Sequence, residues 1–424
     1  MAAIKGVQGP IVHKCTHYSQ SVALKRVTDL PKFCAGTLPG CRRKFFMRTE
    51  QLTWSAPAGW RQPEVRLESP AQCVLAFGSP QALRHADALN QLSNLYPQAS
   101  IVGCSTAGEI CGLSVQDDTL VATALHFEHT QLRVASAMVG DAQDSYQTGA
   151  TLAAELNSPG LIHVMVFSDG LHVNGTALAN GLREHLPPTV AVTGGLAGDG
   201  DRFEHTLVCV GTTVSEKCVA AIGFYGDRLK VGYGSLGGWD SFGPERLVTR
   251  SRDNVLFELD GQPALDLYKR YLGEHAGQLP ASALLFPLAL RGESIDGSVV
   301  RTILAVNESQ GSMTFAGDIP QGTYAQLMKA NFDRLIDGAA GAARAGLQRL
   351  DSFTPDLAIL ISCVGRKLVL KQRVEEEIES VQEVLGPQAT LAGFYSYGEI
   401  CPHVSLTKCE LHNQTMTVTT FSEQ

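Results

Sequence analysis

Soft metal ligands gather near the C-terminus of the chain. Cys401, His403, Cys409 and His412 fall within a dozen residues, in the spacings C-x-H and C-x-x-H. Thiolate and imidazole groups are preferred zinc ligands, although this spacing fits no standard zinc module. Cys401 precedes Pro402, as in short haem-regulatory motifs, and imidazole is a common axial ligand of haem iron. The pattern predicts a metal or haem site with His412, His403 and Cys401 as candidate ligands. The alternative is that Cys401 and His403 are loop residues and that His412 caps a strand.

Two glutamates occupy matching positions in two similar segments. GCSTAGEIC at residues 103–111 and GFYSYGEIC at residues 393–401 have the same length and share their Gly, Glu, Ile and Cys positions. Paired carboxylates can perform acid–base catalysis. They can equally hold a turn by accepting backbone N–H bonds, or bind a cationic ligand group. Because duplication alone explains the pair, Glu109 and Glu399 are predicted to be ligand-binding rather than catalytic residues.

A cysteine and an arginine stand in SCVGRK, at the end of a predicted strand. A nearby cation lowers the pKa of a thiol, so Cys363 is a candidate nucleophile. The sequence places no histidine to act as its base. The alternative is a small buried cysteine, with Arg366 as a ligand-binding or ion-pairing group. Arg366 would then bind a small ligand together with Tyr395, Tyr397 and Glu399.

The elements that must position these residues recur three times along the chain. Each copy has an apolar strand, a helix, a second strand that runs into a glycine-rich turn, and a further strand. The copies begin at residues 72–79, 161–170 and 356–367, and their turns lie within residues 100–110, 189–200 and 390–400. Such units bury their apolar faces against a common sheet. The sequence therefore predicts a mixed α/β fold, with the glycine-rich turns at one sheet edge, where α/β proteins usually bind ligands.

The predicted organisation is a two-domain chain with an N-terminal extension. Residues 1–46 lack helix or strand periodicity and are predicted to be a flexible or mis-started extension. The turn Asp260-Gly261 suggests a boundary, which gives domains at residues 47–260 and 261–424. Apolar spacing predicts helices over residues 262–273 and 323–348.

Composition excludes several classes of protein. Hydrophobic residues make up 44% of the 424 residues and charged residues 18%, so the chain has ample core-forming material. The net charge of -8 argues against nucleic-acid binding. No window approaches the roughly 18 consecutive apolar residues of a membrane span. The 11 cysteines form no C-x-x-C pair, which is typical of reduced thiols in the cytoplasm. No phosphate-binding loop, H-E-x-x-H or G-x-S-x-G motif is present.

The chain resembles the FIST family, whose members carry paired FIST N and FIST C sensory domains. The resemblance covers roughly residues 70–421. It rests on GCSTAGEI, SDGLHVNG, TGGLAGDG, AGDIPQG, SCVGRK, GFYSYGEI and LHNQT, in this order. The resemblance implies a bacterial signal-input module that binds a small ligand, such as an amino acid, and is not an enzyme.

Within that family, separate chains of about this size resemble the haem-binding, nitric-oxide-sensing proteins called NosP. This narrower resemblance implies a haem cofactor and a partner histidine kinase or cyclic-di-GMP enzyme. His412, which lies in LHNQT, is then the first candidate for the axial ligand, followed by His403 and Cys401. His163, His172 and His205 are next in line. Two alternatives stay open: a haem-free sensor of an amino acid or similar metabolite, and a thiol enzyme centred on Cys363.

Overall fold

The computed structural model describes residues 46–424, except residues 57, 62–65, 294, 296–297, 351–352 and 403–408. The extension predicted for residues 1–46 lies outside this part, apart from Phe46. The described residues belong to one compact unit. In the described part, no helix is both long enough and apolar enough to cross a membrane.

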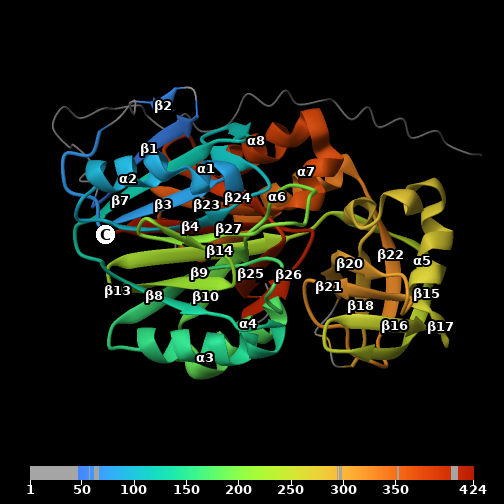
Figure 1. Cartoon of the computed structure of the whole chain (residues 1–424). Coiled ribbons are helices and arrows are strands. Elements are labelled where there is room, and N and C mark those ends of the chain that lie inside the picture. Colours follow the sequence, from blue (N-terminus) through green and yellow to red (C-terminus); the bar gives the residue numbers. More distant parts are fainter. Residues whose placement is uncertain are drawn as a thin grey trace, which may run out of the picture. The chain divides into compact units, whose positions relative to one another are not determined.

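The chain contains three units that share one order of main strands, and the second and third units carry an additional helix, α3 or α6, before the second of these strands (Figure 1). The first unit has β1 (Met47–Ser55), β3 (Cys73–Gly78), α1 (Pro80–Arg84), α2 (Ala86–Leu95), β4 (Ser100–Ser105), β5 (Glu109–Cys111), β6 (Ser114–Gln116) and β7 (Leu120–Phe127), with the short β2 (Gly59–Trp60) beside β1. The second has β8 (Gln131–Met138), α3 (Ser145–Leu156), β9 (Leu161–Ser168), α4 (Gly175–His185), β10 (Ala191–Leu196), β11 (Val208–Val210), β12 (Thr213–Ser215) and β13 (Cys218–Tyr225). The third has β14 (Leu229–Leu236), α6 (Phe332–Gln348), β23 (Leu357–Cys363), α7 (Val364–Leu370), α8 (Val374–Leu385), β24 (Thr390–Ser396), β25 (Gly398–Pro402), β26 (Cys409–His412) and β27 (Met416–Glu423).

Each unit sends one hairpin into the sheet of another unit. Strand β5 pairs with β24, β11 pairs with β4, and β25 pairs with β10. The three sheets therefore have equivalent strand orders: β12-β11-β4-β3-β7-β1-β2, β26-β25-β10-β9-β13-β8 and β6-β5-β24-β23-β27-β14. The mixed α/β fold and the threefold repeat predicted from the sequence are confirmed. The cyclic exchange of hairpins also locks the three units to one another.

The three units share a detail of backbone conformation. In each unit a residue just before the last strand has a positive φ: 56° at Asp118, 54° at Lys217 and 63° at Gln414. Each of these residues stands two positions before the residue that forms the last pair with β3, β9 or β23. Residues other than glycine rarely adopt this conformation. Its recurrence at equivalent positions supports a common origin for the three turns.

The core lies on both faces of the sheets. Between the sheets, the rings of Phe77 and Phe394 are 4.8 Å apart, and Phe167 lies 5.4 Å from Phe77. The outer faces are covered by helices: α1 and α2 on the first sheet, α3 and α4 on the second, and α6 and α8 on the third. Figure 1 shows α3 and α4 below the strands of the second sheet. Burial of this apolar surface is the main favourable contribution to folding.

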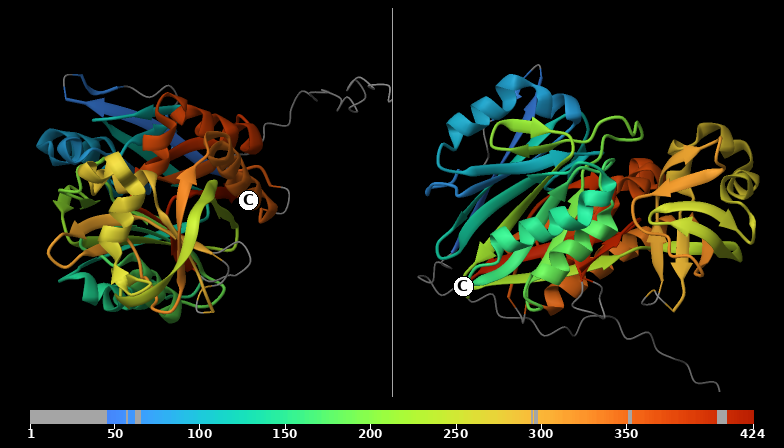
Figure 2. Two further views of the ribbon diagram at one scale, coloured as in Figure 1. Left: turned by 90° about the vertical axis from the view of Figure 1, so that its right-hand side faces the viewer. Right: turned by 60° about the horizontal axis from the view of Figure 1, so that its bottom comes forward.

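An insert separates β14 from α6 and forms a sheet with its own core, drawn in yellow and orange in Figure 2. Its elements are β15 (Trp239–Arg252), β16 (Val255–Leu259), β17 (Gln262–Pro263), α5 (Ala264–Leu272), β18 (Leu288–Arg291), β19 (Val299–Arg301), β20 (Ile303–Asn307), β21 (Ser312–Phe315) and β22 (Tyr324–Ala330). Two short 3-10 helices, Gly273–Gln278 and Ala281–Leu285, belong to the insert, and two more lie outside it at Ala142–Asp144 and Lys371–Arg373.

The predicted domain boundary at Gly261 falls within the sheet of the insert, between the paired strands β16 and β17.

One of the two predicted helices is confirmed and the other is partly wrong. Helix α5 matches the prediction for residues 262–273. Residues 324–330, which were expected to begin a helix, instead form β22 between β15 and β18. The segment YAQLMKA is rich in helix formers, but pairing with two neighbouring strands overrides that local propensity.

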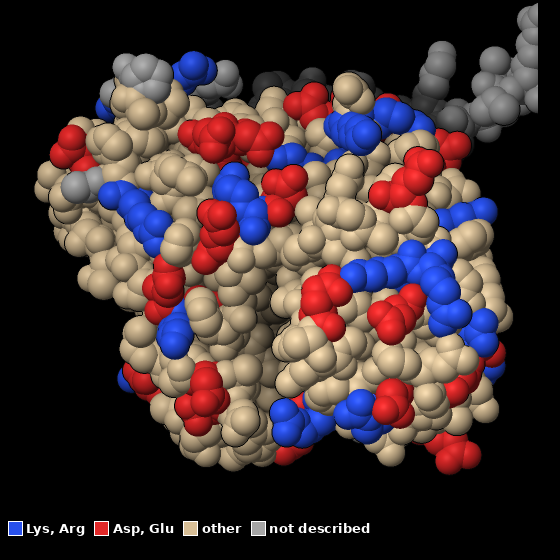
Figure 3. All heavy atoms as spheres, turned by 45° about the vertical axis from the view of Figure 1, so that its right-hand side comes forward, with Lys and Arg blue, Asp and Glu red and all other residues tan. Residues whose placement is uncertain are grey.

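The surface of the insert carries charges of both signs. Arg246 pairs with Asp260 at 3.1 Å, and Arg250 pairs with Glu258 at 2.9 Å. Figure 3 shows basic and acidic side chains interspersed over this face of the molecule. Exposed ion pairs of this kind contribute little to stability.

Candidate functional site

A cavity of about 520 Å³ is lined by residues from all three units. It lies beyond the carboxyl ends of β3 and β4, beside the glycine-rich turn of the first unit. Its charged residues are Glu109, Asp117 and Asp118 from the first unit, Asp201 and Arg202 from the second, and Lys367 and Lys371 from the third. Charges of both signs therefore face one small volume, at the sheet edge where the sequence predicted a ligand site.

Glu109 is the buried carboxyl group of this cavity. Thr106 Oγ1 donates a hydrogen bond to one carboxyl oxygen. Thr119 donates to the other from its backbone N at 3.2 Å and from Oγ1 at 2.6 Å. Burial raises the pKa of Glu109 to about 7, although these hydrogen bonds oppose the shift. Glu109 can therefore gain or lose a proton near neutral pH.

Glu399 has the same arrangement in the third unit. Ser396 Oγ donates to it at 2.6 Å, while Thr415 donates from its backbone N at 3.1 Å and from Oγ1 at 2.9 Å. Burial raises the pKa of Glu399 to about 8. Both glutamates are buried, but Glu399, unlike Glu109, does not line the cavity.

The insert covers the turn that contains Glu399. Gln414, next to Thr415, donates from Nε2 to Leu284 O at 3.1 Å, and Arg301 donates from Nη1 to Leu411 O at 3.1 Å. The two glutamates predicted as a pair thus lie in equivalent turns with different surroundings.

The two raised pKa values predict how stability depends on pH. An acid whose pKa rises from 4.5 on folding binds more protons in the folded state. The tighter proton binding of the folded state stabilises it relative to the unfolded chain. This contribution to the free energy of unfolding is complete below pH 4.5 and is lost as pH rises through about 7 for Glu109 and about 8 for Glu399. We expect the free energy of unfolding to fall over this window, by up to roughly 3 kcal/mol for Glu109 and up to roughly 5 kcal/mol for Glu399.

Urea denaturation at about pH 5 and about pH 8 measures this loss. The variants Glu109→Gln and Glu399→Gln should each flatten the dependence, because neither amide titrates. Glu204→Gln, which alters an exposed carboxylate, is the matched control and should leave the slope unchanged. Wild-type stability that stays constant or rises between the two pH values would contradict this expectation.

Lys367 connects the third unit to the turn of the first. Its Nζ donates to Ala107 O at 2.8 Å and forms an ion pair with Asp117. The side chain is 17% exposed and lies 5.7 Å from the centre of the Tyr395 ring. Lys367 therefore contributes a positive charge to the cavity while holding α7 against the first unit.

Two residues predicted to bind ligand lie inside the third unit, away from this cavity. Arg366 donates to Glu377 from Nε at 3.0 Å and from Nη2 at 2.7 Å. Tyr395 donates to the same carboxylate from its hydroxyl at 2.6 Å, and Ser362 donates at 3.1 Å. All four side chains are fully buried, so the guanidinium group serves the core of this unit. Two roles were left open for Arg366, ligand binding and ion pairing, and the geometry supports ion pairing.

Tyr397, the other tyrosine predicted to bind ligand, contacts the loop that carries Gly200 of the cavity wall. Its hydroxyl contacts Asp199 and lies 3.0 Å from Gly200 O. Phe203 stacks on its ring at a centroid distance of 4.8 Å. Tyr397 is fully buried and does not itself line the cavity.

Of the residues proposed as haem ligands, the two that the structure describes, His412 and Cys401, are engaged or buried within the protein. His403 lies outside the described residues. His412 Nε2 is 3.0 Å from the carbonyl oxygen of Cys401, across the β25–β26 hairpin. Cys401 is fully buried, and burial raises the pKa of its thiol well above the ordinary value. A thiol that stays protonated is a poor iron ligand, and neither His412 nor Cys401 lines the cavity. Among the described residues, no group of three His, Cys, Asp or Glu side chains could hold a metal ion.

The second group of histidines is also engaged within the protein. His163 is fully buried, burial lowers its pKa to about 3, and its Nε2 lies 2.9 Å from Thr193 Oγ1. His172 contacts Asp169 at 3.1 Å, and His205 contacts Glu216 at 2.9 Å. None of the three lines the cavity.

Cys363, the candidate nucleophile, is buried at the end of β23. Burial raises the pKa of its thiol far above the ordinary value. The neighbouring Arg366 opposes this shift only weakly, because its charge is paired with Glu377. The structure places a protonated thiol in the core at this position, in agreement with the alternative of a small buried cysteine.

Sequence reasoning found Glu109 but missed most of the charged residues around it. Lys367 directly follows Arg366 in SCVGRK, and Arg202 follows the glycine-rich TGGLAGDGD. Asp117 lies in a loop without a recognisable motif. The available signal was that charged residues follow glycine-rich strand ends in all three units.

Comparisons with known protein families identify two domains in the chain. The family model of the FIST N domain matches residues 72–262, and that of the FIST C domain matches residues 264–402. The chain therefore belongs to the FIST family, whose domains are ligand-binding sensory domains of signalling proteins. The whole lining of the three-unit cavity falls within the matched residues.

Individual relatives are distant. An uncharacterized protein of Methanocaldococcus jannaschii is 26% identical over 207 residues, which cover 45% of this chain and 38% of that protein. A crystal structure of a cyanuric acid hydrolase from A. caulinodans is similar at a TM-score of 0.36 and 7% identity, over 89% of this chain and 99% of that one.

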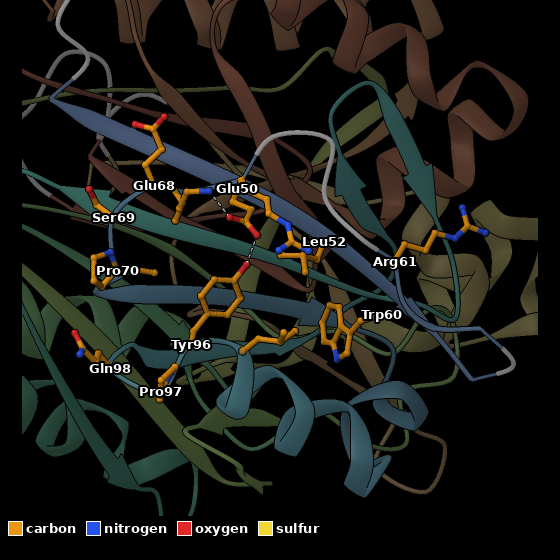
Figure 4. Close-up of a pocket in the computed structure, with 14 residues that line it drawn as sticks. Glu50, Leu52, Trp60, Arg61, Glu68, Ser69, Pro70, Tyr96, Pro97 and Gln98 are labelled. Atoms are coloured by element: carbon orange, nitrogen blue, oxygen red, sulfur yellow. Dashed lines mark hydrogen bonds between the residues drawn. The ribbon is translucent and has the colours of Figure 1, made fainter.

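A second cavity, of about 440 Å³, lies in the first unit outside the matched residues for most of its lining (Figure 4). Tyr96 donates to Glu50 from its hydroxyl at 2.8 Å, and the backbone N of Leu67 donates to the same carboxylate at 2.5 Å. Figure 4 shows Tyr96 and Trp60 on one side of this cavity, with Arg61 directed away from it. The lining of this cavity comes from the first unit alone, whereas the three-unit cavity brings charged residues from all three units together.

Proposed function

We propose that this chain is a non-enzymatic sensory protein that binds a free amino acid, or a similar small zwitterion, in the three-unit cavity. The observation that supports this most is the presence of Lys367, Lys371 and Arg202 together with Asp117 and Asp201 around one volume. A zwitterion presents an ammonium group and a carboxylate, and such a lining offers partners for both. Small-ligand sites commonly combine a concave shape with a few convergent polar groups.

The location of the cavity supports a sensory role. Its walls come from three units, so a bound ligand contacts all three at once. A ligand shifts a conformational equilibrium only through its different affinities for the two states. A site shared between units gives such a difference for any rearrangement that changes the positions of its walls, such as a shift of the loop at residues 200–202. The partner that the narrower resemblance to the nitric-oxide-sensing proteins implies, a histidine kinase or a cyclic-di-GMP enzyme, stays a prediction.

A thermal-shift screen with each of the twenty L-amino acids tests the proposal. A ligand that binds only the folded state adds about 2.7 kcal/mol of stability at a concentration 100 times its Kd. We expect at least one amino acid to raise the Tm of the wild type. Arg202→Gln should abolish this response, because it removes a charge from the cavity wall. Arg61→Gln, which removes an exposed arginine at the edge of the second cavity, is the matched control and should preserve the response.

Three results would overturn the proposal. The first is the absence of a Tm response to every amino acid, and the second is an equal loss of response in Arg61→Gln. The third is a Soret band in protein purified with haem supplied. That band would favour the haem and nitric-oxide hypothesis.

A further inference from the structure

The glycine-rich turn of the second unit is longer than its two counterparts. Strand β10 ends at Leu196 and the next strand begins at Val208, whereas the first and third units need only a few residues at this point. The extra residues form a loop from Ala197 to Leu207. Within this loop, Gly200, Asp201 and Arg202 line the three-unit cavity. The second unit therefore contributes to the cavity through a loop that the other two units lack.

Asp199 organises this loop from inside. Its carboxylate accepts hydrogen bonds from the backbone N of Phe203 at 3.0 Å, and from those of Glu204 and His205 at 2.9 Å each. Asp199 is 1% exposed, so these three donors replace the water that a carboxylate would otherwise bind. Phe203 has a φ of 55°, which turns the chain back toward the carboxylate. The shape of the loop thus depends on the position of a single buried side chain.

Tyr397 holds Asp199 from the third unit. The Tyr397 hydroxyl contacts the Asp199 carboxylate and lies 3.0 Å from Gly200 O, which belongs to the cavity wall. The ring of Phe203 stacks on the Tyr397 ring with an interplanar angle of 23°. Tyr397 therefore contacts the loop on both sides of Asp201 and Arg202.

We infer that Tyr397 is a positioning residue for the ligand site, which anchors the cavity wall at residues 200–202 through Asp199, Gly200 and Phe203. The role in ligand binding rests on the proposed function, whereas the anchoring of the loop does not. Tyr397 also directly precedes Gly398, where β25 begins to pair with β10 of the second unit. A ligand that moves residues 200–202 therefore acts on the strand that joins the second and third units.

Hydrogen–deuterium exchange of the ligand-free full chain tests the anchor. Tyr397→Phe removes the hydroxyl group and keeps the ring that stacks on Phe203. A hydrogen bond to a charged group is lost, so we expect the amides of Phe203, Glu204 and His205 to exchange about tenfold faster. Tyr268→Phe is the matched control, because it removes a buried hydroxyl that donates to Phe286 O within the insert. It should leave exchange at residues 203–205 unchanged.

The thermal-shift screen with the twenty L-amino acids is then repeated on both variants. We expect Tyr397→Phe to weaken the apparent affinity for any responding amino acid about tenfold, and Tyr268→Phe to leave it unchanged. Unchanged exchange at residues 203–205 in Tyr397→Phe overturns the inference whatever the ligand is. Faster exchange with full amino-acid affinity overturns the positioning role. If no amino acid binds the wild type, the proposed function fails, while the exchange result still decides the anchor.

Discussion

Replacing Glu377 by alanine should destabilise the protein by about 3–5 kcal/mol, the cost typical of breaking a buried ion pair. Arg366 and Glu377 form this pair at 2.7 Å, and both side chains are fully buried. Without the carboxylate, the Arg366 guanidinium would remain charged in the core with only backbone carbonyls as partners, Leu335 O and Gly237 O. The hydroxyl groups of Ser362 and Tyr395 would lose their acceptor as well. Urea denaturation of Glu377→Ala measures the loss.

Two further variants separate the ion pair from simple loss of packing. The double variant Arg366→Met, Glu377→Leu removes both charges and keeps most of the volume. It should recover much of the stability, because apolar replacements of buried pairs are often neutral. Arg373→Ala, which breaks an exposed pair with Glu376, should have no measurable effect. A loss in Glu377→Ala no larger than that in Arg373→Ala would contradict the role given to the pair.

This cluster shows why the sequence misleads at Arg366. An arginine that follows a predicted strand is typical of a ligand site at the end of an α/β strand. Its partner Glu377 stands in the run Glu375-Glu376-Glu377, which reads as the solvated face of a helix. Only the packing of α8 against the third sheet turns Glu377 inward, and local periodicity does not contain that information.

Local patterns nevertheless predicted the repeated unit and the position of Glu109. Strand and helix periodicity depend on neighbouring residues, so they could be read along the chain. The hairpin exchange could not, because β5 and β24 pair across more than half of the chain. The same applies to the cavity, whose charged residues come from three units and share no motif. The backbone of the turns also differs in detail: Gly108 has a φ of 140°, whereas its counterpart Gly398 does not have a positive φ.

Replacing Gly393 by alanine should destabilise the protein by about 3 kcal/mol or more, at the upper end of the range for overpacking. A Cβ atom at Gly393 would lie 1.8 Å from Leu360 O, on the neighbouring strand β23. Since the obstructing atom belongs to the backbone of a central strand, β23 and β24 would have to separate. Gly277→Ala is the matched control, because nothing lies within 4 Å of its Cβ position, and it should stay within about 0.5 kcal/mol of the wild type.

The equivalent glycines extend this prediction to the whole molecule. A Cβ atom would lie 1.7 Å from Ala76 O at Gly103, and 1.9 Å from Val166 O at Gly194. We therefore expect similar losses from Gly103→Ala and Gly194→Ala. Because each sheet contains a hairpin from another unit, damage to one sheet should lower the stability of all three in a single cooperative transition. Urea unfolding followed by tryptophan fluorescence and by circular dichroism should give coincident curves for each variant. Separate transitions for the three sheets, or a Gly393→Ala variant as stable as Gly277→Ala, would contradict this account of how the units are held together.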